Sequence, residues 1–290
     1  MQSRFKTMGV VILLLTVTAC SAVKLSYNNA QDLTYWWLNS YIKFTPEQRP
    51  VIKAELAKLH DWHRFNEIPV YTQILQSLQQ KAKHDVTSKQ SCEVMESVRE
   101  RYRMLNLQFE PIIEKLAPSL SHAQLTHMQK HFEKNNKKWH KEWLEGTQEQ
   151  RDQRRLERAI KRAEMFYGRL NDQQKDILKR NIRVSTFDPH YSYSERVRRQ
   201  EDAIATLKKI IDQKLDEADI KLEIAAYFDR FLNGDMAYQN YIDRFKVDAC
   251  EDLSKLHNAT TVEQRNRAAS KLAGYAEDLQ ALRSSAQVNQ

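Results

Sequence analysis

Apolar residues recur at helical spacing through most of the chain, and no stretch of useful length alternates as a β-strand would. The clearest series lies within residues 92–116, where apolar positions advance by alternating steps of three and four, the spacing of a heptad seam. Its members are Met95, Val98, Tyr102, Leu105, Phe109, Ile112 and Leu116. The same rhythm, with one polar interruption, continues in Leu125, Met128, Phe132, Asn135 and Trp139. Pro118 separates the two series, so we expect an antiparallel hairpin, with a homodimeric coiled coil as the alternative.

Four further positions carry the signature of a helix start. Each combines a capping oxygen with a glutamine three residues later, so that cap and glutamine satisfy each other's backbone N–H. They are Thr45–Gln48, Ser121–Gln124, Asn171–Gln174 and Thr261–Gln264. The remaining helices are expected at residues 47–83, 148–169, 172–184, 194–214, 217–232, 235–257 and 262–284. Pro69 should kink or split the first of these, and Pro189 marks a break.

Composition agrees with this pattern, because the 290 residues include only five glycines and six prolines. We therefore predict an all-α protein, an elongated bundle of antiparallel helices over residues 46–290, with a possible sub-boundary near residues 185–193.

The N-terminus has the organisation of an export signal, with Arg4 and Lys6 before an apolar stretch from Gly9 to Val17. Residues Val17-Thr18-Ala19-Cys20 resemble a bacterial lipobox. The resemblance implies a signal peptide over residues 1–19 and a mature chain that carries diacylglycerol and an acyl group on Cys20. The alternatives are a soluble signal peptide with an incidental cysteine and an uncleaved anchor, although the apolar stretch is shorter than the ~20 residues of a membrane span. Because Ser21 rather than Asp follows the cysteine, we expect the outer membrane, facing the periplasm.

The segment 20–45 that follows is rich in aromatic residues, namely Tyr27, Tyr35, Trp36, Trp37, Tyr41 and Phe44. Such a segment beside a lipid anchor suits the membrane interface, where Trp and Tyr are favoured. The alternative is a short amphipathic helix packed on the main body.

The formal net charge is +8. Nucleic acid is not a normal partner of an exported chain, so the anionic partners available outside the cytoplasm are lipid headgroups and the cell wall. The alternative is a solvated surface, which the acidic residues interspersed among Arg151, Arg154, Arg155, Arg158, Lys161 and Arg162 favour. We expect a monomer.

Cys92 and Cys250 remain after lipidation, either as a disulfide in an oxidising compartment or as two small buried side chains.

No catalytic signature is present, and we expect neither an enzyme nor a cofactor beyond the acyl groups. The pairs His60/His63 and His127/His131 have a spacing that can hold a metal, yet two ligands rarely make a site, so we predict no metal site. The polar stretch from Trp62 to Tyr71 is unusual, because it gathers an imidazole, a guanidinium and a carboxylate around Pro69. This stretch forms either a polar pocket where the helix bends or a set of side chains that donate hydrogen bonds to the backbone carbonyls that Pro69, which has no N–H, leaves without a donor.

Several motifs together resemble an uncharacterised family of Gram-negative lipoproteins, a domain of unknown function. They are the lipobox Cys20; Leu25-Ser26-Tyr27-Asn28-Asn29-Ala30; Trp62-His63-Arg64 with Glu67, Pro69 and Tyr71; Gly168-Arg169-Leu170; and His257-Asn258-Ala259-Thr260-Thr261 before Gln264-Arg265. The resemblance implies the localisation and the fold but no activity. It makes Tyr27, Asn28, Asn29, Trp62, His63, Arg64, Glu67 and Tyr71 the candidate polar site.

A weaker resemblance links Leu120-Ser121-His122-Ala123-Gln124 and Leu170-Asn171-Asp172-Gln173-Gln174 to the LTxxQ motif of helical periplasmic chaperones. Membrane-tethered lipase foldases are a further analogue. We therefore expect a non-enzymatic scaffold or chaperone-like binder of an unidentified envelope protein. The alternatives are a lipid or cell-wall contact module with basic helix faces and a metal-dependent enzyme.

Overall fold

The computed structural model describes residues 25–287, so the predicted signal peptide and Cys20 lie outside the described residues. Within this range the chain forms eleven α-helices, a π-helix and a 3-10 turn, and the all-α prediction is confirmed. The helices are α2 (Ala30–Ile42), α3 (Gln48–Trp62), α4 (Ile68–Lys81), α5 (Ser88–Leu116), α6 (His122–Trp143), α7 (Gln148–Tyr167), α8 (Asp172–Val184), α9 (Pro189–Gln213), α10 (Glu217–Asn233), α11 (Met236–Asn258) and α12 (Val262–Gln287). The π-helix His63–Glu67 joins α3 to α4, and the 3-10 turn Ala117–Ser119 joins α5 to α6.

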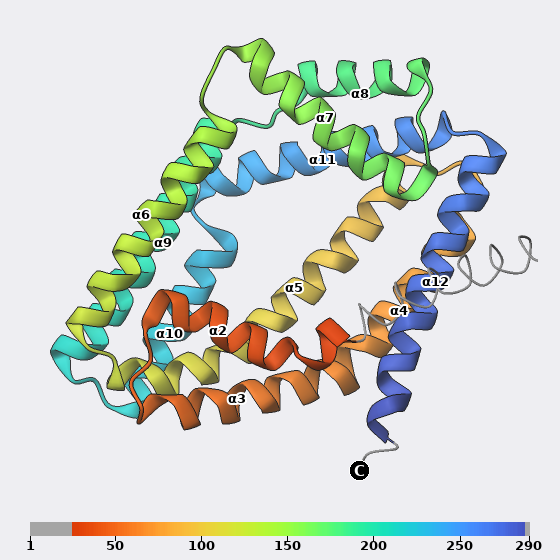
Figure 1. The fold of residues 1–290 in the computed structure, drawn as a ribbon. Helices are drawn as coiled ribbons and strands as arrows, with labels where there is room; N and C mark the ends of the chain where they lie inside the picture. The colour runs from red at the N-terminus through yellow and green to blue at the C-terminus, as the bar shows by residue number, and fades with distance from the viewer. Residues whose placement is uncertain (1–24, 288–290) are drawn as a thin grey trace, which may run out of the picture.

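The helices form a closed frame with one helix crossing its interior (Figure 1). Helices α2 and α3 form the lower side, α4 packs along α12 on the right, α7, α8 and α11 form the upper side, and α6 packs on α9 at the left. Helix α5 runs diagonally and packs on α10, α11 and α3. The C-terminal helix closes the frame by packing on α4, which lies early in the sequence.

The expected hairpin of α5 and α6 is wrong, because among the described helices α6 packs on α9 and α2 instead. The 3-10 turn and the extended Leu120 direct the two helices apart. The apolar face of α6 therefore finds another partner: Leu125 and Met128 share a core with Ile204 and Leu207 of α9. A heptad series shows that a helix face is apolar but does not say which helix covers it.

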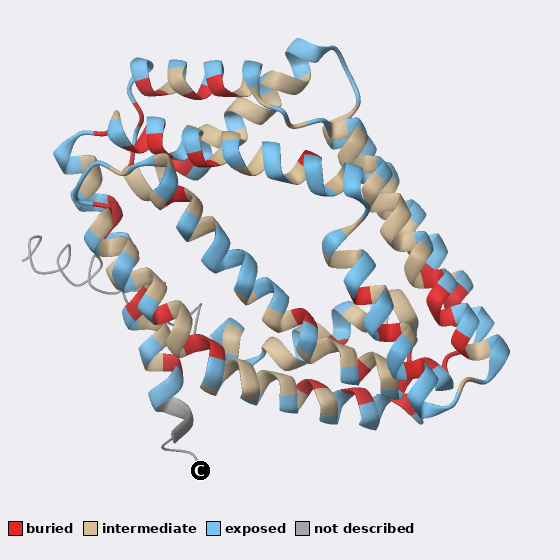
Figure 2. Ribbon diagram, turned by 180° about the vertical axis from the view of Figure 1, so that it is seen from behind, coloured by how far each residue is buried: buried red, intermediate tan, exposed pale blue. Residues whose placement is uncertain are grey.

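The apolar core is divided into clusters that lie where helices meet (Figure 2). One joins α2, α3 and the C-terminal end of α5, a second joins α6, α9 and α10, and a third joins α7, α8 and α11. No residue of α5 between Ser91 and Asn106 is buried. Four of the seven predicted seam residues thus lie outside the core clusters, namely Met95, Val98, Tyr102 and Leu105.

All four predicted capping pairs form, and their glutamines also bond to one another across the frame. Gln48 and Gln124 exchange side-chain amide hydrogen bonds of 3.4 and 2.8 Å, which ties the start of α3 to the start of α6. Gln174 and Gln264 do the same at 2.6 and 3.1 Å, which ties α8 to α12. Each pair is accompanied by bonds to backbone carbonyls, such as that from Gln174 to Ala259. The pairs occupy opposite corners of the frame (Figure 1).

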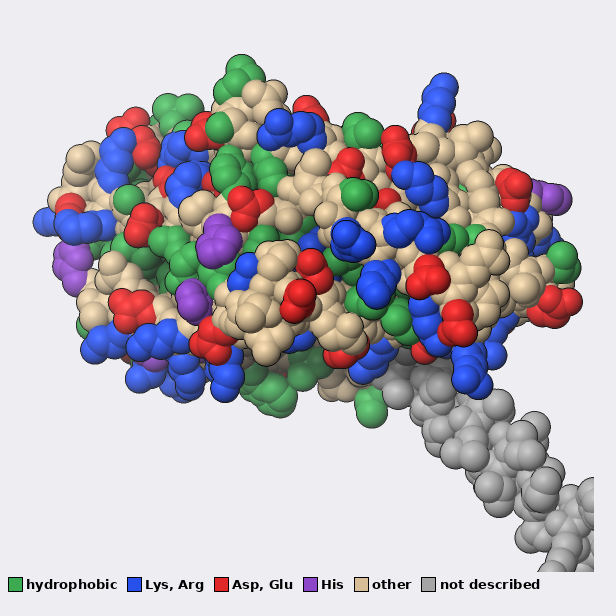
Figure 3. Space-filling model, turned by 90° about the horizontal axis from the view of Figure 1, so that it is seen from above, with side chains coloured by type: hydrophobic (Ala, Val, Ile, Leu, Met, Phe, Trp, Pro, Cys, Tyr) green, Lys and Arg blue, Asp and Glu red, His purple; other side chains and the backbone are tan. Residues whose placement is uncertain are grey.

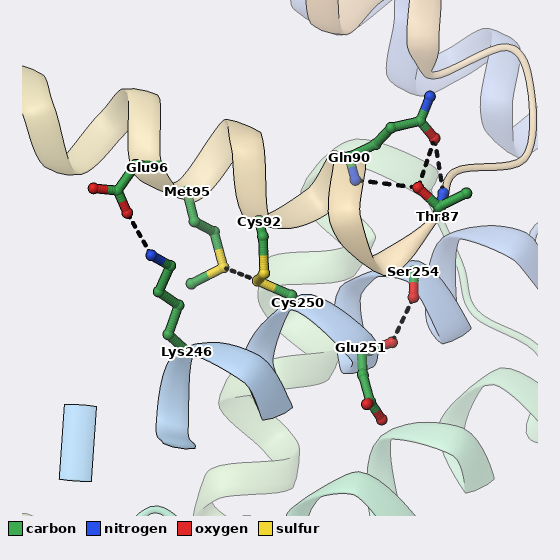
Figure 4. Close-up of a disulfide and its surroundings, with 9 residues drawn as sticks. All are labelled: Thr87, Gln90, Cys92, Met95, Glu96, Lys246, Cys250, Glu251 and Ser254. Carbon is green, nitrogen blue, oxygen red and sulfur yellow. Dashed lines mark hydrogen bonds and ion pairs between the residues drawn. A yellow bond between two sulfur atoms is a disulfide. The ribbon is translucent and has the colours of Figure 1, made fainter. Parts of the chain in front are cut away.

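A disulfide joins Cys92 of α5 to Cys250 of α11 and closes a sequence separation of 158 residues (Figure 4). Met95 Sδ lies 3.6 Å from Cys250 Sγ, and Lys246 forms an ion pair with Glu96 one helical turn away. The bond therefore fixes the upper end of the diagonal helix to the upper side of the frame.

Removal of the disulfide with Cys92→Ala and Cys250→Ala should lower the free energy of unfolding by up to about 5 kcal/mol, because the unfolded chain regains the entropy of a long closed loop. Denaturant unfolding followed by circular dichroism measures this loss. A reducing agent should have the same effect on the native chain and none on the double variant. A double variant as stable as the native chain would contradict the prediction.

Candidate binding sites

The Trp62-His63-Arg64 motif lies where the long N-terminal helix changes its hydrogen-bond pattern. The N–H of Ile68 bonds to the carbonyl of His63, five residues back, which defines a π-turn. Pro69 follows and has no N–H to continue the α-helical ladder, so a wider turn costs no donor at this point. Pro69 was expected to kink or split the helix, and the structure shows a split made by a π-helix. Such turns often mark functional sites.

The π-helix faces the N-terminal Tyr-Asn-Asn motif. The Tyr27 hydroxyl lies 2.9 Å from Nδ1 of His63, and Nε2 of His60 lies 3.1 Å from the Tyr27 carbonyl oxygen. Arg64 donates a 2.8 Å hydrogen bond to Oδ1 of Asn28 and lies over the Tyr27 ring. Two motifs far apart in the sequence thus form one polar cluster.

A buried carboxylate continues this cluster towards α5. The Glu67 side chain is only 3% exposed and accepts a 3.2 Å bond from Arg101 of α5 through Oε1. Its Oε2 is buried without a hydrogen-bond partner in the described structure. Burial raises the pKa of Tyr71, and the negative charge of Glu67 raises it further.

Most residues of the predicted polar site therefore lie together in the structure. Asn29 lies apart from them, and His60 and Arg101 join them. Trp62 contacts His63 edge-on at 6.5 Å between ring centres, and Tyr71 lies 5.6 Å from the same ring. Asn29 instead bonds to the Leu25 carbonyl of its own helical turn. His60 had been considered only as a metal ligand, and Arg101 carried no signal in the sequence because its partner lies 34 residues away.

Burial favours the uncharged forms of Tyr27, His60 and His63 at the centre of this cluster. Burial is the main cause that lowers the pKa of His63 and of His60, and the charge of Arg64 lowers that of His60 further. Burial also raises the pKa of Tyr27 to about 12. A protonated Tyr27 hydroxyl can therefore donate to Nδ1 of a neutral His63.

A second tyrosine–histidine pair lies where α7 and α11 end, on the same side of the frame as α4 and α12 (Figure 1). The Tyr167 hydroxyl lies 2.9 Å from Nδ1 of His257, whose Nε2 lies 2.8 Å from the carbonyl oxygen of His84. Because a carbonyl only accepts, Nε2 carries the proton and Nδ1 accepts from Tyr167. The burial that lowers the pKa of His257 favours this neutral form.

This second pair lines a cavity of about 680 Å³ between α4, α5, α7, α8, α11 and α12. Its walls are mainly apolar and include Leu78, Ala159, Phe166, Leu178, Phe245 and Leu256. Polar and charged side chains stand among them, including Asp252, whose pKa burial raises to about 6. A cavity of this size, with mainly apolar walls and polar groups placed among them, has the character of a small-ligand site, and the sequence did not reveal it.

The remaining candidate groups have structural partners. Within residues 25–287 no cluster of three or more His, Cys, Asp or Glu side chains is arranged to hold a metal ion. His127 bonds to the Ser40 carbonyl, and His131 packs on Tyr41. The arginines of α7 are partly neutralised, as in the pairs Arg155–Asp152 and Arg158–Glu142, and the upper face shows both charges interspersed (Figure 3).

The described residues form an all-α protein whose helices frame one diagonal helix, with a polar cluster at the π-helix and a mainly apolar cavity where α7 and α11 end. The sequence model of DUF6279, a family of unknown function, matches residues 40–218, and the chain belongs to this family. No curated protein and no solved structure matches the chain. Among the described helices, none combines the length and apolar character that a membrane span needs.

The buried histidines predict a dependence of stability on pH. A lowered pKa means that the folded state binds fewer protons than the unfolded state below about pH 6.5, so the free energy of unfolding should fall as the pH drops through this range. The variant His63→Asn should weaken this fall, whereas substitution of the exposed His190 by Asn should not.

Unfolding measured between pH 7.5 and 5 tests this expectation. The raised pKa of Asp252 makes the free energy of unfolding rise as the pH falls, opposite to the effect of His63. Because Asp252 is present in both the variant and the native chain, the difference between them reports on His63. Identical slopes for His63→Asn and the native chain would show that His63 is not the source.

Proposed function

We propose that this protein is an outer-membrane lipoprotein, anchored through Cys20, whose periplasmic helical frame binds other envelope proteins without catalysis. The observation that carries the proposal is the exposed middle part of the apolar seam of α5. Val98 and Tyr102, one helical turn apart, are 57% and 48% exposed although they belong to a heptad series. Exposed apolar side chains at such spacing are a common docking surface for a partner helix.

The charges beside the seam indicate the chemistry of the partner. Arg99 and Arg103 are exposed and have no hydrogen bond or ion pair within the described residues. They lie next to Val98 and Tyr102 in the sequence. A helix with an apolar stripe flanked by acidic residues would therefore complement this surface in both apolar character and charge.

The variant Val98→Asp should abolish the ability of the protein to slow aggregation of a chemically unfolded outer-membrane protein, because it places a charge in the seam. The matched control is Leu222→Asp at an exposed position of α10. Both exposed substitutions should change the free energy of unfolding by at most about 0.5 kcal/mol. Light scattering measures aggregation, and equal protection by both variants would refute the role of the seam.

A second function, contact with the membrane surface, is favoured by the outer face of α2. Tyr35 of α2 and Phe44, just after its end, are buried against the body of the protein. Trp36 and Trp37 of α2 are 63% and 59% exposed. Leu33 lies on the same face, three residues before Trp36. The chain from Cys20 to Leu25 spans at most about 18 Å, so a lipid at Cys20 would hold this face near the bilayer.

Basic residues of α6 lie beside this aromatic face. Trp37 packs on Tyr41, and Tyr41 packs on His131. The positive charges of Lys134 and Lys138 help to lower the pKa of His131, which shows their proximity. Neither lysine has an ion-pair partner among the described residues. Tryptophans beside unpaired lysines suit an anionic lipid surface.

The double variant Trp36→Ser/Trp37→Ser should reduce binding to phosphatidylglycerol vesicles several-fold in a chain that also carries Cys20→Ser. Binding of the parent should weaken as salt rises, because the lysines contribute through screened charges. Cosedimentation measures the bound fraction, with Leu222→Ser as the control. Undiminished binding of the double variant would exclude α2 as the contact.

A further inference from the structure

The cavity between α5, α7, α8 and α11 contains polar groups that the fold leaves unsatisfied. Ser91 Oγ of α5 and Nδ2 of Asn181 of α8 are buried, line the cavity and have no hydrogen-bond partner in the described structure. Both residues are more than nine-tenths buried. A buried donor without a partner destabilises the folded state, so a ligand that accepts hydrogen bonds at these atoms would relieve that cost.

The charges of the cavity favour an anionic ligand. Arg162 of α7 is exposed, lines the cavity and has no ion pair or hydrogen bond among the described residues. Arg155 also lines it and bonds to Asp152. Of the two cavity carboxylates, Asp248 already accepts the Thr186 N–H, and the positive charges of Lys255 and Arg155 act on Asp252. Lys81 lines the cavity as well and forms an ion pair of 4.0 Å with Glu93, so Arg162 is the cavity cation without such a partner in the described structure.

We infer that this cavity binds a single-chain amphiphile, with its acyl chain against the apolar walls and its anionic headgroup at Arg162. The apolar walls supply the main driving force, since each CH₂ group that leaves water for the cavity favours binding. The unpartnered hydroxyl and amide of Ser91 and Asn181 supply donors for the headgroup oxygens. The inference does not depend on the α5 seam, because it uses other residues.

A fluorescent fatty acid tests the inference on the full chain with Cys20→Ser, in which no acyl group of the protein competes. We expect saturable binding at one site and displacement by palmitate or by lysophosphatidylglycerol. The relative strength of these two competitors distinguishes a free fatty acid from a phospholipid as the source of the ligand. A fatty alcohol of equal chain length, which lacks the anion, should compete at least tenfold less well.

Two variants locate the site. Arg162→Ala should weaken binding of the acid about tenfold but leave the alcohol unaffected, Arg162→Lys should restore part of the loss, and Arg180→Ala on the outer face of α8 should have no effect. Ala159→Trp should fill the cavity and block binding, with a thermal melt to verify folding. The inference is overturned if no saturable binding occurs, if Arg162→Ala binds the acid as the parent does, or if only apolar peptides displace the probe.

Discussion

The frame depends on the two glutamine pairs at its opposite corners. Each glutamine lies three residues after a capping residue, and its side chain accepts a hydrogen bond from the backbone N–H of that residue. It also bonds to the glutamine of another helix and to a carbonyl beyond it. Gln174 is fully buried, so each bond that it loses would leave an amide group without water. Because an amide pair requires both partners in register, these contacts fix where four helices begin and how they meet.

The cost of this architecture is that the helix inside the frame is only partly covered. Helix α5 is held at its upper end by Cys92–Cys250 and at its lower end by Ile112 and Leu116, which lie in the core with α2 and α3. Between these ends its apolar residues are not buried. The frame thus presents one apolar surface on α5 and one apolar cavity at the corner, and neither is needed to close the fold.

The sequence was most informative about where helices begin. The capping pairs at Thr45, Ser121, Asn171 and Thr261 placed helix starts within about two residues, because the bonds that satisfy a cap are local. Two further capping boxes, at Thr87 and Thr147, follow the same chemistry and were overlooked. The start of the helix expected at residue 194 lies at Pro189, since Asp188 caps it and proline is tolerated in the first turn.

Tertiary contacts were harder to predict, because nothing local encodes them. The apolar stripe of α6 was visible, but its partner was α9 rather than α5. The candidate polar site was located through motifs that lie together in the fold, yet the π-helix depends on how Pro69 and its neighbours share donors, and Arg101 reaches Glu67 only through the packing of α5. The cavity is made by six helices, so no single stretch of sequence could indicate it.

The distribution of unpaired charge links the proposed surfaces. Several cations of this basic chain are paired, as Arg158 is with Glu142 and Arg230 with Asp202. Three cations without a hydrogen bond or ion pair in the described structure, however, stand beside apolar groups: Arg99 next to Val98, Lys134 near His131 and Tyr41, and Arg162 at the cavity. An unpaired cation next to an apolar surface contributes little to folding, whereas it improves recognition of an anionic amphipathic partner. If the proposed surfaces bind as argued, part of the positive excess of the chain serves recognition rather than folding.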